Sequence, residues 1–427
     1  MVIYHTLRVL ARWGFWVNFR HVYLEHRERI PAGYHVIFAL NHPTAFMEPV
    51  ICGVHVSPRC WYLLRGDKFA TPAARWMLAQ IQNLPIYNQR VAGSDALRKN
   101  IRTMDFATDQ VVAGQPTVIL AEGRWADERR LRPIQRGTAR MLMQAYKKAP
   151  DKPIAIVPGA VNYTAYNEFR SAVTITYGEP ILAGEYAEAY REDSRGTVDA
   201  ITEELERRLR ADVVHVADPK RDDLAEALLP IIQHNYPDPG VPPVRSHNPY
   251  RRAQWAAVER LNDLHEADAE TLRQSLRAYG AALAEARVTD SGLALPRYAS
   301  AWRAMALLLL SPIAAFGWLA NALPAYLAQA RTDRMRLGAQ FYGSVRFGLG
   351  LVLWMVYILV LTVASAFAVG WYALLLPPLL AFAGYGFLVW SESLRLWLRG
   401  ARAGSLDGAT REQLLAMRRD ILSAVGQ

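Results

Sequence analysis

Short apolar runs alternate with longer amphipathic stretches between Pro31 and Gly178. Apolar runs bounded by turn residues are typical of buried strands. They fall at residues 34–40, 59–64, 85–87, 117–120, 154–162 and 173–177. Helical patterns lie at residues 94–112, 138–148 and 197–213. This alternation predicts an α/β domain over residues 23–215, built on an open, mostly parallel sheet with flanking helices.

A proline-rich segment follows this domain. Five prolines fall close together and indicate an extended linker or strap: Pro237, Pro239, Pro242, Pro243 and Pro249. Two helical patterns come next, at residues 253–267 and 269–287, and their short connection predicts a helical hairpin. We therefore expect residues 216–299 to form a linker and a hairpin. The hairpin would be a structural insert, a cover over a binding groove, or a contact for a partner.

The C-terminal third is strongly apolar and predicts a helical membrane region over residues 300–400. Residues 349–369 and 371–390 are long enough to span a bilayer. Basic residues flank this pair on both sides and predict a hairpin with both ends in the cytoplasm: Arg346, Arg395, Arg399 and Arg402. Residues 302–328, broken by Pro312 and Pro324, predict a re-entrant segment, with a single span as the alternative. The tail, residues 401–427, is expected to be a cytoplasmic helix.

The N-terminal 22 residues are apolar but are interrupted by Arg8, Arg12 and Arg20. These charges are too frequent for a cleaved signal peptide or a clean span. Amphipathic anchors are provided by Trp13, Trp16 and Phe19. We expect an amphipathic helix lying in the membrane interface. A helix packed on the α/β domain is the alternative.

The composition of the chain indicates that its partner is a membrane. The 427 residues are 52% hydrophobic and carry a net charge of +10. The aromatic residues lie in apolar runs and are not interleaved with basic ones, which argues against nucleic acid. The sequence has no serine-hydrolase elbow, Walker loop, dinucleotide fingerprint or common zinc spacing. Cys52 and Cys60 are too few for a disulfide scaffold and indicate ordinary buried thiols. We expect no cofactor and no metal.

The clearest candidate chemistry follows the first strand of the domain. His42 comes directly after the apolar run 34–40, and Glu48 lies six residues further on, with Pro43 expected to open the next helix. Imidazole can take a proton from an alcohol at neutral pH, and a carboxylate can hold it in the working tautomer. At a strand end, the pair would lie where α/β sheets bind ligands. On its own, such a pair is more often structural.

Three further segments, in a fixed order, favour the functional interpretation. Residues 84–90 end in Arg90; Ala121-Glu122-Gly123-Arg124 opens a basic loop that closes with Leu131-Arg132-Pro133 and Gly137; residues 154–160 form a strand stopped by Pro158. Together with the His42 segment, this set resembles the four sequence blocks of the glycerolipid acyltransferase superfamily. That superfamily includes lysophosphatidate and glycerol-3-phosphate acyltransferases. The resemblance covers residues 20–215. The long first block looks closest to the branch of fungal-type glycerol-phosphate acyltransferases.

The resemblance implies a role for each matching residue. His42 would be the general base, and Glu48 would orient it. Arg90 would bind the phosphate of the acceptor, since a guanidinium holds phosphate through two hydrogen bonds. Glu122 and Gly123 would shape the acceptor site, Glu122 by accepting from a glycerol hydroxyl, by tethering Arg90, or by capping the following turn.

Three positions depart from the family pattern. Glu48 stands where the family usually has Asp, and it lies on the longer of the two spacings. Trp125 stands where many relatives carry Arg, so the phosphate contact of this block would pass to another basic residue of the loop: Arg124, Arg129 or Arg130. Ala121 replaces the usual Pro. These departures bear on rate and substrate more than on the chemistry.

The resemblance therefore implies a membrane-bound O-acyltransferase. It would move a fatty acyl group from acyl-CoA or acyl-carrier protein to glycerol 3-phosphate or 1-acylglycerol 3-phosphate, in phospholipid biosynthesis. The expected location is the inner (cytoplasmic) membrane, with the catalytic domain facing the cytoplasm. The same chemistry on dihydroxyacetone phosphate or a non-phosphate lysolipid is one alternative. A catalytically weak lipid-binding protein is another.

Overall fold

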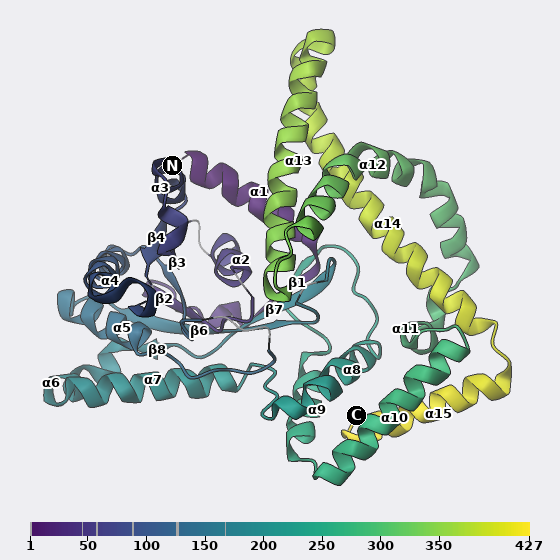
Figure 1. The fold of residues 1–427 in the computed structure, drawn as a ribbon, viewed down its shortest axis with the longest axis horizontal. Coiled ribbons are helices and arrows are strands. Elements are labelled where there is room, and N and C mark those ends of the chain that lie inside the picture. Colours follow the sequence, from purple (N-terminus) through teal and green to yellow (C-terminus); the bar gives the residue numbers. More distant parts are fainter. Residues whose placement is uncertain (1, 45, 57–58, 88, 125–127, 167) are drawn as a thin grey trace. The chain divides into compact units, whose positions relative to one another are not determined.

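The computed structural model describes residues 2–44, 46–56, 59–87, 89–124, 128–166 and 168–427. The chain forms two compact units. Unit 1 comprises Met1–Val213 and Pro243–Asn248, and unit 2 comprises Val214–Pro242 and Pro249–Gln427. The two units are described separately below (Figure 1).

Unit 1 is built on one sheet with the strand order β4-β3-β5-β2-β6-β7-β1-β9, and β8 pairs with β6. The strands are β1 Phe19–Glu25, β2 His35–Leu40, β3 Trp61–Arg65, β4 Asn83–Ile86, β5 Thr117–Leu120, β6 Ile154–Tyr163, β7 Ser171–Tyr177, β8 Ile181–Leu182 and β9 Val244–Arg245. β4, β3, β5, β2 and β6 are mutually parallel, whereas β7 and β8 run antiparallel to β6. The predicted mostly parallel α/β sheet is confirmed.

Helices cover both faces of this sheet because its central strands are apolar on both sides. They are α1 Val2–Asn18, α2 Met47–Val56, α3 Pro72–Gln80, α4 Gln89–Val112, α5 Gly137–Lys148, α6 Ala187–Glu192 and α7 Ser194–Arg210, with short 3₁₀ turns η1 Arg27–Arg29, η2 Gly66–Phe69 and η3 Ala183–Tyr186. The main core lies under α4, α5 and α7, where Ile37 and Ala39 of β2 meet Met141 and Leu205. On the other face, Phe38 contacts the ring of Tyr177.

The N-terminal segment differs from the prediction. Residues 1–22 were expected to form one interfacial helix, but α1 ends at Asn18 and Phe19 begins β1. Phe19 is buried, so it is no membrane anchor, and Tyr4 and Phe15 are buried as well. The strand forms because β1 finds partners far away in the sequence, β7 and β9. One face of α1 thus packs on unit 1. Contact of its other face with a membrane stays a prediction.

Unit 2 is helical. Its elements are η4 Pro219–Arg221, α8 Asp222–Gln233, α9 Arg251–Asp263, α10 Glu266–Glu285, α11 Asp290–Ala294, η5 Pro296–Tyr298, α12 Ala301–Arg334, α13 Ala339–Val369, η6 Gly370–Leu375, α14 Leu376–Gly404 and α15 Gly408–Ala424. A second core joins α8, α9, α10 and α15, through side chains such as Leu228, Val258, Leu276 and Ile421. The tail helix α15 is therefore part of a packed subdomain.

The prolines of α12 do not interrupt it, although the sequence predicted a break. Each proline deprives the carbonyl four residues earlier of its N–H donor. The Leu308 carbonyl, opposite Pro312, accepts instead from Ser311 Oγ at 2.7 Å. The Ala320 carbonyl, opposite Pro324, accepts from Tyr357 Oη of α13 at 2.9 Å. Side-chain donors of this kind let a proline stay inside an apolar helix.

Two helical segments of unit 2 are long and apolar enough to cross a membrane: Ala301–Arg334 and Phe341–Gly404. The second includes the turn η6, where Gly370 has a φ of +59°. Only 17% and 6% of their most apolar windows are buried in the structure. Most of these side chains therefore lack protein neighbours, unlike those of a soluble core helix. Whether the first segment crosses or re-enters, and on which side each end lies, stay predictions.

Candidate active site

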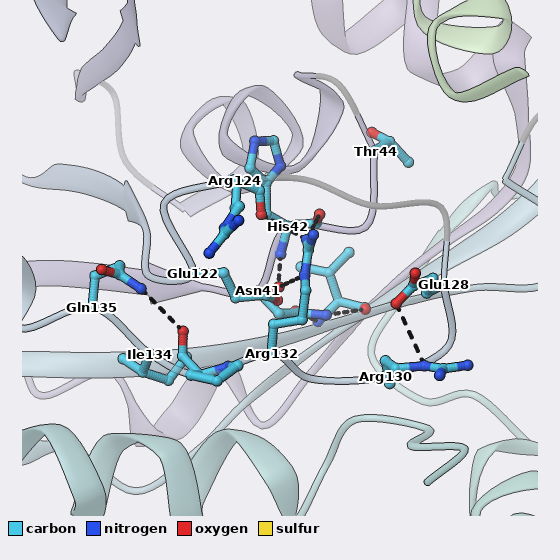
Figure 2. A network of polar contacts seen from close by, with 12 residues as sticks. Asn41, His42, Thr44, Glu122, Arg124, Glu128, Arg130, Arg132, Ile134 and Gln135 are labelled. Carbon is cyan, nitrogen blue, oxygen red and sulfur yellow. Dashed lines mark hydrogen bonds and ion pairs between the residues drawn. The ribbon is translucent and has the colours of Figure 1, made fainter. Parts of the chain in front are cut away.

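The chain leaving β2 is fixed by the side chain of Asn41. Its Nδ2 donates to the Val161 carbonyl at 3.0 Å, and its Oδ1 accepts from the Val161 N–H at 2.6 Å. The amide thus extends the ladder between β2 and β6 by one rung. The next residue is His42, whose N–H donates to Glu122 Oε1 at 3.0 Å. These bonds place His42 at the carboxyl ends of β2 and β5 (Figure 2).

Glu48 lies in the first turn of α2 and is completely buried. Its Oε1 accepts the Thr44 N–H at 2.7 Å. Its Oε2 lies 3.6 Å from His42 Nδ1. Pro43 does not open the helix, contrary to the prediction, because α2 begins at Met47. The Glu48 carboxylate thus accepts the N–H of a residue that lies three positions before the helix starts.

The His42 ring and the Glu48 carboxylate are complementary neighbours. Among the described residues, neither His42 Nδ1 nor Glu48 Oε2 has another hydrogen-bond partner, and His42 is only 7% exposed. A distance of 3.6 Å is too long for a hydrogen bond, but catalytic contacts often tighten only when substrate binds. A buried carboxylate favours a donor opposite it. The tautomer with Nδ1–H facing Glu48 satisfies this need and leaves Nε2 as the base.

Tyr163 on β6 completes the surroundings of Glu48. Its Oη donates to Glu48 Oε1 at 3.4 Å. Burial raises the pKa of Tyr163 well above its ordinary value, and the nearby charge of Glu48 raises it further. The phenol therefore keeps its proton at any working pH and remains a donor. Sequence reasoning missed this residue, because nothing in the strand pattern marks which tyrosine faces the carboxylate.

Glu122 is held by an arginine that sequence reasoning did not select. Arg132 Nε donates to Glu122 Oε2 at 2.8 Å. Arg132 Nη2 donates to the Arg124 carbonyl at 2.6 Å and lies 3.4 Å from the His42 carbonyl. Glu122 thus contacts the backbone N–H of His42, and Arg132 contacts its carbonyl (Figure 2). The available signal was the position of Arg132 inside the Leu-Arg-Pro closing of the third block.

Gly123 allows the turn between Glu122 and the exposed Arg124. Its φ is +71°, a conformation that glycine adopts without strain. A Cβ at this position would meet Gln135 Cγ at 3.0 Å. Gln135 in turn donates its N–H to the Ala121 carbonyl at 2.8 Å. The closing of the basic loop therefore packs directly on its opening.

Two other arginines of the loop bind protein groups. Arg129 is buried, and its Nη1 and Nη2 donate to the carbonyls of Tyr163 and Thr164 at 2.8 and 2.9 Å. Arg130 Nε lies 3.5 Å from a Glu128 oxygen. Arg129 therefore anchors the loop to the end of β6. Arg124 is exposed, and its carbonyl accepts from the same Arg132 nitrogen that lies near the His42 carbonyl.

Comparison with known proteins places this geometry in a family. Residues 21–160 match the family model described as Acyltransferase. An 88-residue stretch is 36% identical to glycerol-3-phosphate O-acyltransferase 2 of Saccharomyces cerevisiae, covering 20% of this chain and 12% of that protein. Residues 21–160 thus carry an acyltransferase domain, and both matches support the resemblance to the glycerolipid acyltransferase superfamily.

Other similarities are more distant. A 102-residue stretch is 28% identical to the uncharacterized acyltransferase C1718.04 of Schizosaccharomyces pombe, covering 22% of this chain and 15% of that protein. Among solved structures, the 1-acyl-sn-glycerophosphate acyltransferase PlsC of Thermotoga maritima matches with a TM-score of 0.35 and 14% identity, over 48% of this chain and 80% of that one. The chain thus matches less than a sixth of the length of either curated relative.

Arg90 occupies the end of the second block of the acyltransferase domain. The strand β4 ends at Ile86, and Arg90 lies in the first turn of α4, not at the strand end as predicted. The helix start is placed by Asn100, which donates to the Tyr87 carbonyl and accepts its N–H at 2.8 and 2.7 Å. β4 is three strand positions from β2, about 14 Å along the same edge. The Arg90 side chain and Trp125 lie outside the described residues, so their roles stay predictions.

The remaining candidates for metal or thiol chemistry do not form a site in the described parts of the chain. Within those parts, no three His, Cys, Asp or Glu side chains come together to hold a metal ion. Cys52 and Cys60 are buried and form no disulfide with one another. Burial raises the pKa of Cys52, whose sulfur accepts a hydrogen bond from Tyr177. A buried thiol with a raised pKa is unreactive.

Replacing Gly123 with alanine in the acyltransferase domain is expected to lower the free energy of unfolding by about 1–2 kcal/mol. A Cβ is disfavoured at a φ of +71°, and it would also push Gln135 away. Thermal unfolding of the purified protein measures the effect. The control is Gly184→Ala, since Gly184 has no positive φ and open space around it. Equal stability of the two variants would contradict the role given to Gly123.

Proposed function

We propose that the protein is a membrane-bound O-acyltransferase that acylates a glycerol-phosphate hydroxyl. The acceptor would be glycerol 3-phosphate or 1-acylglycerol 3-phosphate. One observation carries the proposal: the His42 ring faces the buried Glu48 carboxylate at 3.6 Å, at the sheet edge where Glu122 and Arg132 hold its backbone. The yeast relative, a glycerol-3-phosphate O-acyltransferase by name, supports the acceptor class.

The reaction follows from this geometry in one transfer. The acceptor hydroxyl gives its proton to His42 Nε2 while its oxygen attacks the thioester carbonyl. Glu48 stabilises the imidazolium that forms and keeps the ring oriented. The tetrahedral intermediate then collapses, the C–S bond breaks, and the proton passes from His42 to the leaving thiolate. The products are the acyl ester and a free thiol. No acyl-enzyme is required, because the acceptor supplies the nucleophile.

The acceptor phosphate requires cations beyond His42. Arg90 and Arg124 are the candidates, because both follow strands that end at this edge of the sheet. Glu122 has a positioning part besides the substrate contact or the tether on Arg90 that the resemblance implies. Its oxygens accept from the His42 N–H and from Arg132, so it positions the base. Gly123 would let the backbone of this turn approach the acceptor closely, because glycine has no side chain.

The membrane location rests on the two apolar helical segments of unit 2. Both the acyl chain and the acylated product are poorly soluble in water, so the reaction requires access to a lipid surface. We place the protein in the inner (cytoplasmic) membrane, with the acyltransferase domain facing the cytoplasm. There acyl-CoA or acyl-carrier protein serves as the acyl donor. The basic residues flanking the apolar segments support this orientation.

An acceptor panel tests the proposed function. Purified protein is incubated with labelled acyl-CoA or acyl-carrier protein and one acceptor at a time: glycerol 3-phosphate, 1-acylglycerol 3-phosphate, dihydroxyacetone phosphate, or a lysolipid without a phosphomonoester. We expect labelled product with the first two. Product only with the lysolipid would overturn the phosphate site. Lack of product with every pair would favour a lipid-binding protein.

Replacing Glu48 with glutamine is expected to lower kcat about 100-fold. The amide keeps the size of the side chain and can still accept the Thr44 N–H, but it cannot stabilise an imidazolium. The substitution leaves no buried charge without a partner, so the thermal unfolding midpoint should not fall. Initial rates at saturating donor and acceptor measure the effect. If Glu48→Gln has the kcat of the wild type, Glu48 has no part in the mechanism.

A further inference from the structure

Helix α3 is an exposed helix of unit 1 that the candidate site does not use. None of its nine residues is buried. Trp76 is 61% exposed and Met77 is 56% exposed. Large aromatic side chains are seldom this exposed on a water-facing helix, and adjacent exposed apolar residues mark an interaction surface.

The helix nevertheless has a defined local structure. Thr71 caps its N-terminus, with Oγ1 accepting the Ala74 N–H at 3.1 Å, and Pro72 occupies the first turn. The half-buried side chains of Ala74 and Leu78 face the domain. Trp76 lies on the opposite face, and Met77 lies on the flank between these two faces. A helix on a water-soluble surface has polar residues there instead. The exposed ring is thus held outward by a capped helix.

The segment that contains α3 and the preceding turn η2 carries net positive charge. Residues 65–80 contain Arg65, Lys68 and Arg75 against a single acid, Asp67, which leaves a local formal charge of +2. Asp67 pairs with both Arg65 and Lys68, at 3.0 and 3.7 Å. All four charged side chains are exposed. Tryptophan and methionine flanked by basic residues match the boundary between lipid headgroups and acyl chains, where anionic lipid attracts the cations.

The position of α3 in the sheet is also informative. The turn η2 begins where β3 ends, and α3 leads from it back to the start of β4. Since β3 is parallel to β5 and β5 to β2, the end of β3 lies at the same edge as His42. Figure 1 shows α3 beside β4, at the border of the sheet. The start of α3 therefore lies at the edge that carries the candidate active site.

We propose that α3 docks the acyltransferase domain on an anionic bilayer surface, with Trp76 and Met77 inserted among the acyl chains. Two exposed apolar side chains are too small a patch for a stable interface with a second protein, which needs about 800 Å² on each partner. They suffice for partial insertion into lipid. This docking brings the edge with His42 to the surface from which an amphiphilic acceptor arrives.

Quenching by labelled lipid tests the docking. The full chain is placed in nanodiscs that contain anionic phospholipid and doxyl-labelled acyl chains. A bimane probe is attached to Trp76→Cys or Met77→Cys, and the native thiols are buried and unlabelled. The control is Lys152→Cys, at an exposed turn before β6 and thus at the opposite edge of the sheet. We expect about threefold stronger quenching at residues 76 and 77 than at residue 152. Equal quenching would overturn the proposal.

A kinetic comparison tests the consequence and rests on the proposed function. The double variant Trp76→Glu/Met77→Glu should lose about tenfold in kcat/KM for a long-chain acceptor in vesicles containing anionic lipid. With a soluble short-chain acceptor in detergent it should stay within about twofold of wild type. Equal losses with both acceptors would overturn the docking role. If the wild-type protein acylates no glycerol-phosphate acceptor, the proposed function fails, while the quenching result still decides the docking.

Discussion

Replacing His42 with alanine is expected to reduce acyl transfer by about 10³–10⁴-fold in kcat. The variant loses the only imidazole beside the buried Glu48 among the described residues. Its residual rate would come from binding and orientation alone. Initial rates with saturating acyl-thioester and acceptor measure the loss. Circular dichroism and thermal unfolding of the same sample show whether the domain is folded.

The control for this substitution is His265→Ala. His265 is exposed, precedes α10 in unit 2 and makes no side-chain capping bond. It should retain wild-type kcat, so a general effect of losing a histidine is excluded. A folded His42→Ala protein with a kcat within threefold of wild type would contradict the assignment of the base.

Replacing Arg132 with methionine is expected to lower both stability and activity. The Glu122 carboxylate, buried and paired with Arg132 at 2.8 Å, would lose its counter-charge. Leaving a buried charge unpaired costs about 2–3 kcal/mol. Because Glu122 also holds the His42 N–H, the base would shift, and kcat should fall about 100-fold. Thermal unfolding and initial rates are the two measurements.

Two further variants separate the positioning role from a simple loss of charge. In Arg132→Met/Glu122→Gln no buried charge is unpaired, so the double variant should recover most of the lost stability but not the activity. The control Arg136→Met removes a more exposed pair with Asp199, worth less than about 1 kcal/mol. Full activity in the Arg132→Met variant would show that Arg132 has no part in positioning His42.

The central fold was predictable because its signals are local. The runs that form β2, β5 and β6 are apolar on both faces, which distinguishes buried parallel strands from their amphipathic helices. By contrast, β1 and β9 form only through partners distant in sequence, and β9 lies inside the proline-rich segment expected to be a linker. Their pairing depends on contacts between segments that are distant in sequence, so no local sequence pattern predicts it.

The membrane region shows a second kind of limit. Pro312 and Pro324 indicated a broken helix, yet α12 continues through both. The reason is that Ser311 and Tyr357 donate to the two carbonyls that the prolines leave without an N–H. Tyr357 comes from another helix. Its contribution depends on how α12 and α13 pack, which the sequence of α12 alone does not contain.

The sequence predicted most residues of the candidate site, but it did not predict most of the contacts between them. The spacing of His42 and Glu48 anticipated their proximity, and the structure brings them together. Glu122 was expected to accept from a substrate hydroxyl, to tether Arg90 or to cap the following turn. The structure adds contacts that were not expected, with the His42 N–H and Arg132. A loop that folds back over ten residues decides which of several arginines reaches the acid. Composition gives no preference among them.

A single-turnover experiment tests the central claim most directly. Labelled acyl-thioester and glycerol-phosphate acceptor are mixed with excess protein, quenched at short times and separated into lipid and protein fractions. We predict that label passes straight to the acceptor, with none bound covalently to the protein, and that His42→Ala shows no transfer at these short times. Label on the protein before product appears, or transfer by His42→Ala at the wild-type rate, would contradict direct attack assisted by His42.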